Sequence, residues 1–203
     1  YASYGVNRYG ENLAGEEAVY QVSADGGDTW SGLQIIEAGS RKNATGISHG
    51  VFLARDGELW AFHGAFADRL GVDQHTRAYR LYDATGKWEA KGRLLDGFWP
   101  LQEPVRMADG NWIMSGARLG DGNPAAVAIS RGDNLTDWDL VVIPRPAGLK
   151  MWGESALFLS GSRVISIARC DGRQPVALAA FSDDYGRTWT PSEPSDLPMA
   201  ASK

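Results

Sequence analysis

An eight-residue phrase occurs twice in this chain, and it constrains the fold more than any other feature. Residues 23–30 are SADGGDTW and residues 182–189 are SDDYGRTW, so both fit the pattern S-x-D-x-G-x-T-W. Self-similarity at long range is the signature of repeat architectures, in which one supersecondary unit recurs along the chain. We therefore expect a fold that is built from repeated units.

The residue types in the phrase indicate a turn that is stabilised by its own side chains. Ser and Asp bond to nearby backbone groups, glycine accepts a positive φ, and Thr and Trp favour the start of a strand. We expect a structural hairpin turn that leads into a strand, with the tryptophan packed inside; calcium or sugar binding by Asp25 or Asp184 is the alternative. The positions concerned are Ser23, Asp25, Gly27, Thr29, Trp30, Ser182, Asp184, Gly186, Thr188 and Trp189.

Two weaker copies of the phrase lie between the strong ones. Residues 83–88 (DATGKW) keep the aspartate and the tryptophan with the glycine displaced, and residues 130–138 (SRGDNLTDW) are one residue longer. The tryptophans at positions 30, 88, 138 and 189 are 58, 50 and 51 residues apart, close to the period of about 40–50 residues of a propeller blade. The spacing predicts four units with approximate bounds 1–46, 47–100, 101–151 and 152–203.

Each unit after the first also contains a predicted β-hairpin. Residues 48–63, 103–118 and 154–169 each show an apolar run, a short turn and a second apolar run. Asp-Gly between apolar runs is a strong hairpin signal, and no segment has a helical period over a useful length. We predict an all-β fold: a β-propeller of four-stranded antiparallel blades, about four of them in this chain, in one domain.

The repeated phrase resembles the Asp-box, or BNR repeat, of the sialidase (neuraminidase) superfamily. The resemblance implies that these turns lie on the outer hairpins of the blades, away from the active site, and it favours a secreted or periplasmic location. It also implies a six-bladed propeller, so we expect the chain to be a fragment of a longer one; a four-bladed closure is the alternative. An open array of blades should self-associate through its edges.

The last unit carries the strongest resemblance. Glu154-Ser155, a strand, a turn, a second strand and Arg169 are followed by the second Asp-box and by SDLP at residues 195–198, in the order found in sialidases. The resemblance implies that Glu154 polarises a tyrosine nucleophile and that Arg169 is one of three arginines that bind the substrate carboxylate. Planar guanidinium groups suit that task. The alternatives are a solvated charge for Glu154 and a surface ion pair for Arg169.

Much of the family's site has no match in the chain. The other two arginines, the catalytic aspartate and the nucleophilic tyrosine cannot be assigned, so we do not expect this chain alone to hydrolyse a sialoside. Spacing and position add further candidates for substrate binding. Two of them stand at the start of a predicted hairpin, one stands at the end of a hairpin, and two are tryptophans that precede a hairpin. These candidates are His49, Glu103, Arg118, Trp99 and Trp152.

Two other functions stay open. His49 and His63 flank one hairpin, and histidine suits proton abstraction near neutral pH, which would fit a propeller polysaccharide lyase; a non-catalytic carbohydrate-binding propeller is the other alternative. The expected partner is an acidic glycan, with no cofactor and no metal. The formal net charge of −5 and the lack of a basic run argue against nucleic acid, and no apolar stretch approaches the roughly 18 residues of a membrane span.

Overall fold

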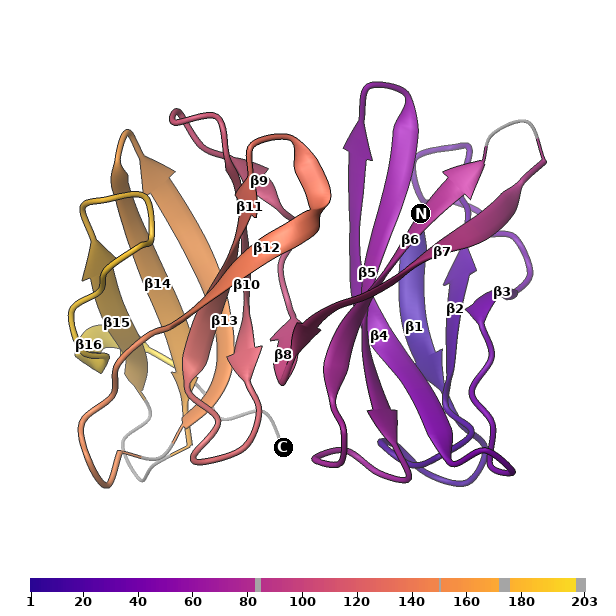
Figure 1. Cartoon of the computed structure of the whole chain (residues 1–203), viewed down its shortest axis with the longest axis horizontal. Coiled ribbons are helices and arrows are strands. Elements are labelled where there is room, and N and C mark those ends of the chain that lie inside the picture. Colours follow the sequence, from indigo (N-terminus) through magenta and orange to yellow (C-terminus); the bar gives the residue numbers. More distant parts are fainter. Residues whose placement is uncertain (83–84, 150, 172–175, 200–203) are drawn as a thin grey trace. The chain divides into compact units, whose positions relative to one another are not determined.

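The computed structural model describes residues 1–82, 85–149, 151–171 and 176–199, which contain strands and no helix (Figure 1). This confirms the predicted all-β class. No helix that could cross a membrane is found in the described part of the chain. The chain divides into two compact units, unit 1 (Tyr1–Trp99) and unit 2 (Pro100–Lys203).

Unit 1 contains two antiparallel sheets. The first has the order β1-β2-β3, with bounds Ala2–Val6, Glu17–Gln21 and Gln34–Glu37. The second has the order β4-β5-β6-β7, with bounds Thr45–Arg55, Glu58–Ala67, His75–Tyr82 and Lys87–Asp96. The first sheet therefore has one strand fewer, among the described residues, than the predicted four-stranded blade.

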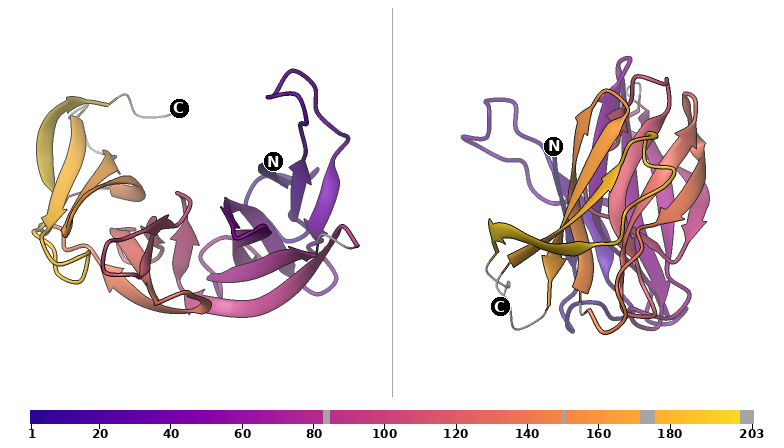
Figure 2. Two further views of the ribbon diagram at one scale, coloured as in Figure 1. Left: turned by 90° about the horizontal axis from the view of Figure 1, so that it is seen from above. Right: turned by 90° about the vertical axis from the view of Figure 1, so that its left-hand side faces the viewer.

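Unit 2 also contains two antiparallel sheets, and the short strand β8 (Phe98–Pro100) lies at the boundary between the units. In the first sheet, β9 and β11 flank β10 and β12 follows β11, with bounds Val105–Arg106, Trp112–Arg118, Ala125–Arg131 and Asn134–Val142. The second has the order β13-β14-β15-β16, with bounds Met151–Ser160, Arg163–Cys170, Val176–Ser182 and Glu193–Pro198. Within this second sheet, strands that are consecutive in sequence thus lie side by side (Figure 2).

The core of unit 2 lies between its two sheets, because alternate residues of a strand point to the same face. Ile113 and Val127 from one sheet and Leu157 and Val164 from the other belong to one buried cluster. Along β13 this alternation is clear, since Leu157 is 5% exposed and its neighbour Phe158 is 60% exposed. Full burial of one such aliphatic side chain contributes about 1.5–3 kcal/mol.

The predicted hairpins are present at β4–β5 and β13–β14, but the middle one is shorter than expected. In the first, Asp56 and Gly57 have φ values of 50° and 78°, as a two-residue type I′ turn requires. In the middle hairpin β9 has only two residues, and Glu103 lies before it instead of starting it. Pro104 explains the difference, because proline has no N–H to donate to the neighbouring strand.

Both strong copies of the repeated phrase are turns that bond to themselves. In the second copy, Ser182 Oγ donates to Asp184 Oδ1 (2.8 Å) and accepts the Gly186 N–H (2.9 Å). Asp184 accepts the N–H of Thr188 at 2.8 Å and its hydroxyl at 2.7 Å. The backbone bond from Thr188 is the main reason why the pKa of Asp184 falls to about 2.

The first copy makes the corresponding bonds. Thr29 donates its N–H and its hydroxyl to Asp25 (3.0 and 2.5 Å), and Gly27 donates its N–H to Ser23 Oγ (2.8 Å). These bonds, chiefly the Thr29 hydroxyl, lower the pKa of Asp25. Gly27 and Gly186 have φ values of 103° and 80°, so both glycines adopt the positive φ expected of them.

The two copies differ in how their tryptophans pack. Trp189 packs against the core of unit 2, whereas Trp30 is 45% exposed, so the prediction of a packed ring is wrong for the first copy. The reason is the surroundings: a Cβ on Gly186 would lie 2.7 Å from Ile113, and one on Gly27 would meet only Trp30. Neither tryptophan starts a strand, because β3 and β16 begin several residues later.

The weaker copies keep part of this geometry. Trp138 donates its indole N–H to the carbonyl of Leu135 (2.7 Å), three residues earlier. Trp30 and Trp189 make the same three-residue bond, at 3.0 and 2.8 Å. In the copy at residues 83–88, Asp83 and Ala84 lie outside the described residues.

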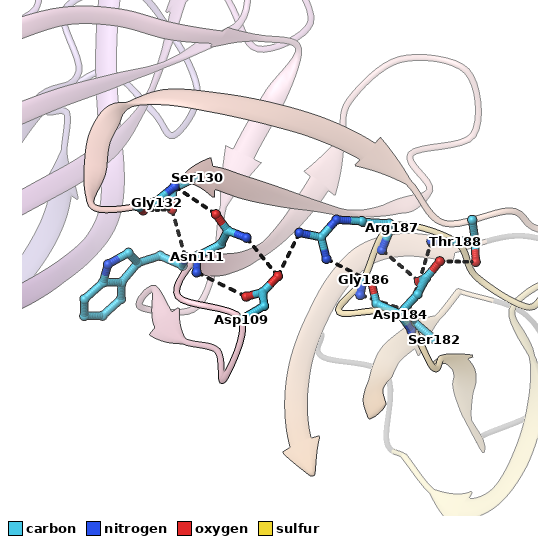
Figure 3. A network of polar contacts seen from close by, with 10 residues as sticks. Asp109, Asn111, Ser130, Gly132, Ser182, Asp184, Gly186, Arg187 and Thr188 are labelled. Carbon is cyan, nitrogen blue, oxygen red and sulfur yellow. Dashed lines mark hydrogen bonds and ion pairs between the residues drawn. The ribbon is translucent and has the colours of Figure 1, made fainter. Parts of the chain in front are cut away.

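Arg187 connects the second turn to the neighbouring sheet of unit 2 (Figure 3). Its Nη2 donates to Asp109 Oδ2 at 2.7 Å, on the turn between β9 and β10. Asp109 also accepts from Asn111 Nδ2 (2.8 Å), and Asn111 Oδ1 accepts the N–H of Gly132 (2.8 Å). Burial opposes the charge of Asp109, but the bonds from Arg187 and Asn111 lower its pKa overall.

Candidate functional site

Glu154 and Arg169 lie in contact at one end of the last sheet. Glu154 is near the start of β13 and Arg169 near the end of β14, and the antiparallel register places these ends together. Arg169 Nη1 donates to Glu154 Oε2 at 2.9 Å. The side chain of Arg169 is 18% exposed and that of Glu154 is 50% exposed, so a largely covered cation meets an accessible carboxylate.

Asp171 is a second carboxylate beside Arg169, and the sequence analysis did not identify it. Its Oδ1 lies 3.7 Å from Arg169 Nη2. The hydrogen bond to Glu154 is the main reason why the pKa of Arg169 is raised, so the guanidinium stays charged. The only signal in the sequence is spacing, because residues two apart on an extended chain point to the same side.

Trp152 and Arg118 lie at the same end of unit 2. Trp152 is 38% exposed and stands two residues before Glu154 on β13. Between them, Gly153 has no room for a side chain, because a Cβ would lie 2.5 Å from the carbonyl oxygen of Pro124. Arg118, at the end of β10, donates its N–H to that same carbonyl (2.9 Å). Glu103 is exposed and lies outside the strands of its sheet.

In unit 1, His49 and Trp99 are hydrogen-bonded to each other. Trp99 Nε1 donates to His49 Nε2 at 3.2 Å, and His49 Nδ1 lies 3.2 Å from Ser48 Oγ. An indole N–H only donates, so Nε2 is the acceptor and the neutral ring carries its proton on Nδ1. Both nitrogens are therefore engaged. Trp99 itself is 5% exposed and stacks on Phe66, so it does not present a free face to a sugar.

His63 is completely buried. Its Nδ1 donates to the carbonyl of Ser48 (2.7 Å), and its Nε2 has no hydrogen-bond partner within the described part of the chain. Loss of solvation lowers the pKa of His63 to about 4. A substrate cannot reach this ring, and His49 has no free nitrogen, so the geometry does not favour either histidine as a general base.

Comparison with known proteins identifies the fold. The sequence matches the family model of the BNR repeat-like domain over residues 19–203. No curated protein matches the chain. Among solved structures, a protein of unknown function from Dyadobacter fermentans has a TM-score of 0.70 at 16% identity, over 93% of this chain and 61% of its own.

Two sialidase structures are also similar in fold to this chain. The Hadza microbial sialidase Hz136 has a TM-score of 0.71 at 15% identity, over 96% of this chain and 44% of its own. The NanB sialidase of Streptococcus pneumoniae has a TM-score of 0.69 at 9% identity, over 90% of this chain and 47% of its own. The chain thus spans about half the length of these sialidases. With the family match over most of its length, the chain belongs to the family of the BNR repeat-like domain, and its fold is similar to that of these sialidases, which are β-propellers.

Proposed function

We propose that this chain is part of a sialidase-like glycoside hydrolase that removes an acidic sugar, such as a sialic acid, from the end of a glycan. Family membership supports the class of enzyme. The observation that carries the proposal is the contact between Arg169 and Glu154 at one end of β13 and β14, with exposed Trp152 two residues before Glu154 on β13. It combines a covered cation, an accessible carboxylate and an exposed aromatic ring.

In this proposal Arg169 binds the carboxylate of the substrate. A guanidinium group offers parallel N–H donors that match a carboxylate. Glu154 and Asp171 lie beside Arg169, at 2.9 and 3.7 Å. Exchange of one exposed carboxylate for another costs little, because exposed ion pairs contribute only about 0–1 kcal/mol. Once displaced, Glu154 is available to accept the proton of a tyrosine nucleophile, the chemistry that sets sialidases apart from two-carboxylate glycosidases.

We also propose that the four sheets are four blades of one propeller domain, with units at about 1–46, 47–100, 101–151 and 152–203. The chain spans 44% and 47% of two sialidase structures, which supports a propeller with more blades than these. The residues of a sialidase site that this sequence does not match would then come from outside it.

A binding experiment tests the role of Arg169. We expect this chain to bind N-acetylneuraminic acid more tightly than its methyl ester, and we expect Arg169→Gln to raise the Kd for the acid about tenfold, as for a charge-assisted hydrogen bond. The matched control is Arg163→Gln at the opposite end of β14, where Arg163 pairs with exposed Asp183. NMR titration measures the Kd values of the wild-type chain and of both variants. Equal affinity for acid and ester would contradict the proposal.

Non-catalytic carbohydrate binding is the second candidate, and the exposure of Trp152 favours it, because indole rings stack on the apolar faces of sugars. The full-length protein distinguishes the two. Hydrolysis of a fluorogenic sialoside that is lost in Glu154→Ala and Arg169→Gln supports the hydrolase. Sialoside binding without hydrolysis, lost in Trp152→Ala, supports the binding module. An increase in absorbance from unsaturated uronates, lost in His49→Ala, would support a lyase instead.

A further inference from the structure

Two arginines and a tyrosine meet on the surface of unit 1. Arg8 and Tyr9 belong to the loop between β1 and β2, and Arg41 to the turn between β3 and β4. Arg8 Nη2 donates to Tyr9 Oη at 2.5 Å. The guanidinium carbons of Arg8 and Arg41 lie 4.7 and 4.1 Å from the centre of the Tyr9 ring. We call these three residues the Tyr9 cluster.

Hydrogen bonds of Asn7 and Glu16 hold the loop that carries Tyr9 in place. Asn7 Oδ1 accepts the N–H of Tyr9 (3.0 Å), and Asn7 Nδ2 donates to the carbonyl of Leu13 (2.9 Å). Glu16, which is 2% exposed, accepts the N–H of Asn12 at 2.6 Å. A buried carboxylate therefore fixes the far end of the loop, so that Arg8 and Tyr9 are already positioned before any ligand arrives.

Arg41 is positioned by the backbone around it. Gly15 has a φ of 92°, and a Cβ there would lie 2.8 Å from Arg41 Cγ, so the absence of a side chain makes room for the stem of Arg41. The turn that contains Arg41 is closed by two backbone bonds between Ser40 and Thr45 (2.9 and 2.8 Å). Preorganised side chains lose less entropy when a ligand binds.

The charges of the Tyr9 cluster are not balanced. Elsewhere in unit 1, Arg77 pairs with Glu37 at 3.2 Å, but within the described residues neither Arg8 nor Arg41 has a carboxylate at ion-pair distance. Both contact Tyr9, which is 50% exposed and whose pKa is lowered by hydrogen bonds from Arg41 and Arg8. Two like charges beside one ring repel each other, and an anion between them relieves that repulsion.

We propose that the Tyr9 cluster is a binding site for an oxyanion, the carboxylate or sulfate group of an acidic glycan. Arg8 and Arg41 supply the N–H donors of two guanidinium groups, and the hydroxyl of Tyr9 supplies a third donor. Guanidinium groups bind carboxylates and tetrahedral oxyanions in the same bidentate manner. The site lies in unit 1 and Arg169 in unit 2, so this proposal does not depend on the proposed function.

Titration of the chain with glucuronate, glucose 6-sulfate, inorganic sulfate and neutral glucose tests the site. We expect saturable binding of the anions, weaker at high ionic strength because the site is exposed, and no binding of glucose. Binding of glucuronate but not of the sulfates would indicate a carboxylate site. Binding of the sulfates as well would indicate a general oxyanion site. Signals of the arginine side-chain N–H groups, followed by NMR, report the contact directly.

Single substitutions identify the residues that bind. We expect Arg8→Gln and Arg41→Gln each to raise the Kd about fivefold, the upper end for an exposed charged pair, and Tyr9→Phe to raise it less. Gly15→Ala should also raise the Kd with both arginines present, because it displaces Arg41. Arg163→Gln serves as the control and should leave the Kd unchanged, and circular dichroism confirms that each variant is folded.

Two results would overturn the proposal. One is the absence of saturable binding for every anion at low ionic strength. The other is binding that persists unchanged in folded Arg8→Gln and Arg41→Gln. Loss of binding in Arg169→Gln, with the arginine variants of the Tyr9 cluster unchanged, would assign the anion to the site in unit 2 instead.

Discussion

Replacement of Asp184 by alanine is expected to lower the free energy of unfolding by about 2–4 kcal/mol, because a hydrogen bond to a charged group contributes about 1.5–3 kcal/mol. Asp184 accepts bonds from the N–H of Arg187 (3.1 Å), from the N–H and hydroxyl of Thr188 and from Ser182. Without the carboxylate these donors lose their partner beside the core of unit 2. Urea unfolding followed by circular dichroism measures the loss.

Asp25→Ala is the matched control, since Asp25 makes the corresponding bonds in the exposed first copy. We expect a smaller loss there, because water can replace the missing acceptor. Equal losses in the two variants would show that packing around the second turn does not matter. Acid provides an independent check: the pKa of Asp184 is about 2 when folded and 3.8 when unfolded. Its contribution to stability is complete above pH 3.8 and is lost as the pH falls toward 2.

Acidification to about pH 4 is expected to lower the free energy of unfolding through His63 by up to about 3 kcal/mol. The folded chain keeps this buried ring neutral, with a pKa of about 4, whereas the unfolded chain has the ordinary value of 6.5. Between these two values the unfolded state binds more protons, so stability falls as the pH decreases. The loss begins near pH 6.5 and is complete below pH 4.

His63→Phe tests the assignment, because phenylalanine has a similar ring and cannot take up a proton. The ring contacts of His63 with Phe52 and Tyr79 (6.3 and 5.9 Å between centroids) are compatible with that change. We expect the variant to lose most of the dependence on pH between 6.5 and 4. His75→Gln, a change of a partly exposed histidine on β6, should keep it. A wild-type slope in His63→Phe would assign the acid sensitivity to other groups.

Features that depend on residues close together in the sequence could be predicted, and features that depend on contacts between distant residues could not. The self-bonded turns follow directly from Ser, Asp, Gly and Thr at fixed spacing, because every donor and acceptor lies within a few residues. The exposure of Trp30 could not be predicted in this way, since the turns around Trp30 and Trp189 share the bonds of Ser, Asp, Thr and the indole N–H, and the burial of the ring depends on the sheet beside the turn. Pro104 accounts for the short strand β9, because proline has no N–H to donate, and this is visible in the sequence.

The same distinction applies to the candidate sites. Glu154 and Arg169 were identified from the order of motifs, and their contact follows from an antiparallel pair of strands. Arg8, Tyr9 and Arg41 come from two irregular segments without hydrophobic period, so no pattern in the sequence brings them together. His49 and Trp99 were predicted as candidates for substrate binding, and the hydrogen bond between them is seen only in the folded structure.

The bond between Arg187 and Asp109 makes two repeats of this chain dependent on each other. The residues are 78 positions apart in sequence, and in the first copy of the phrase the position of Arg187 is occupied by Asp28. If residues 23–30 replaced residues 182–189, the aspartate at the position of Arg187 would place a negative charge opposite Asp109. Neighbouring repeats are therefore not fully interchangeable modules, and substitutions at the two positions should have non-additive effects on stability, because the side chains are in contact.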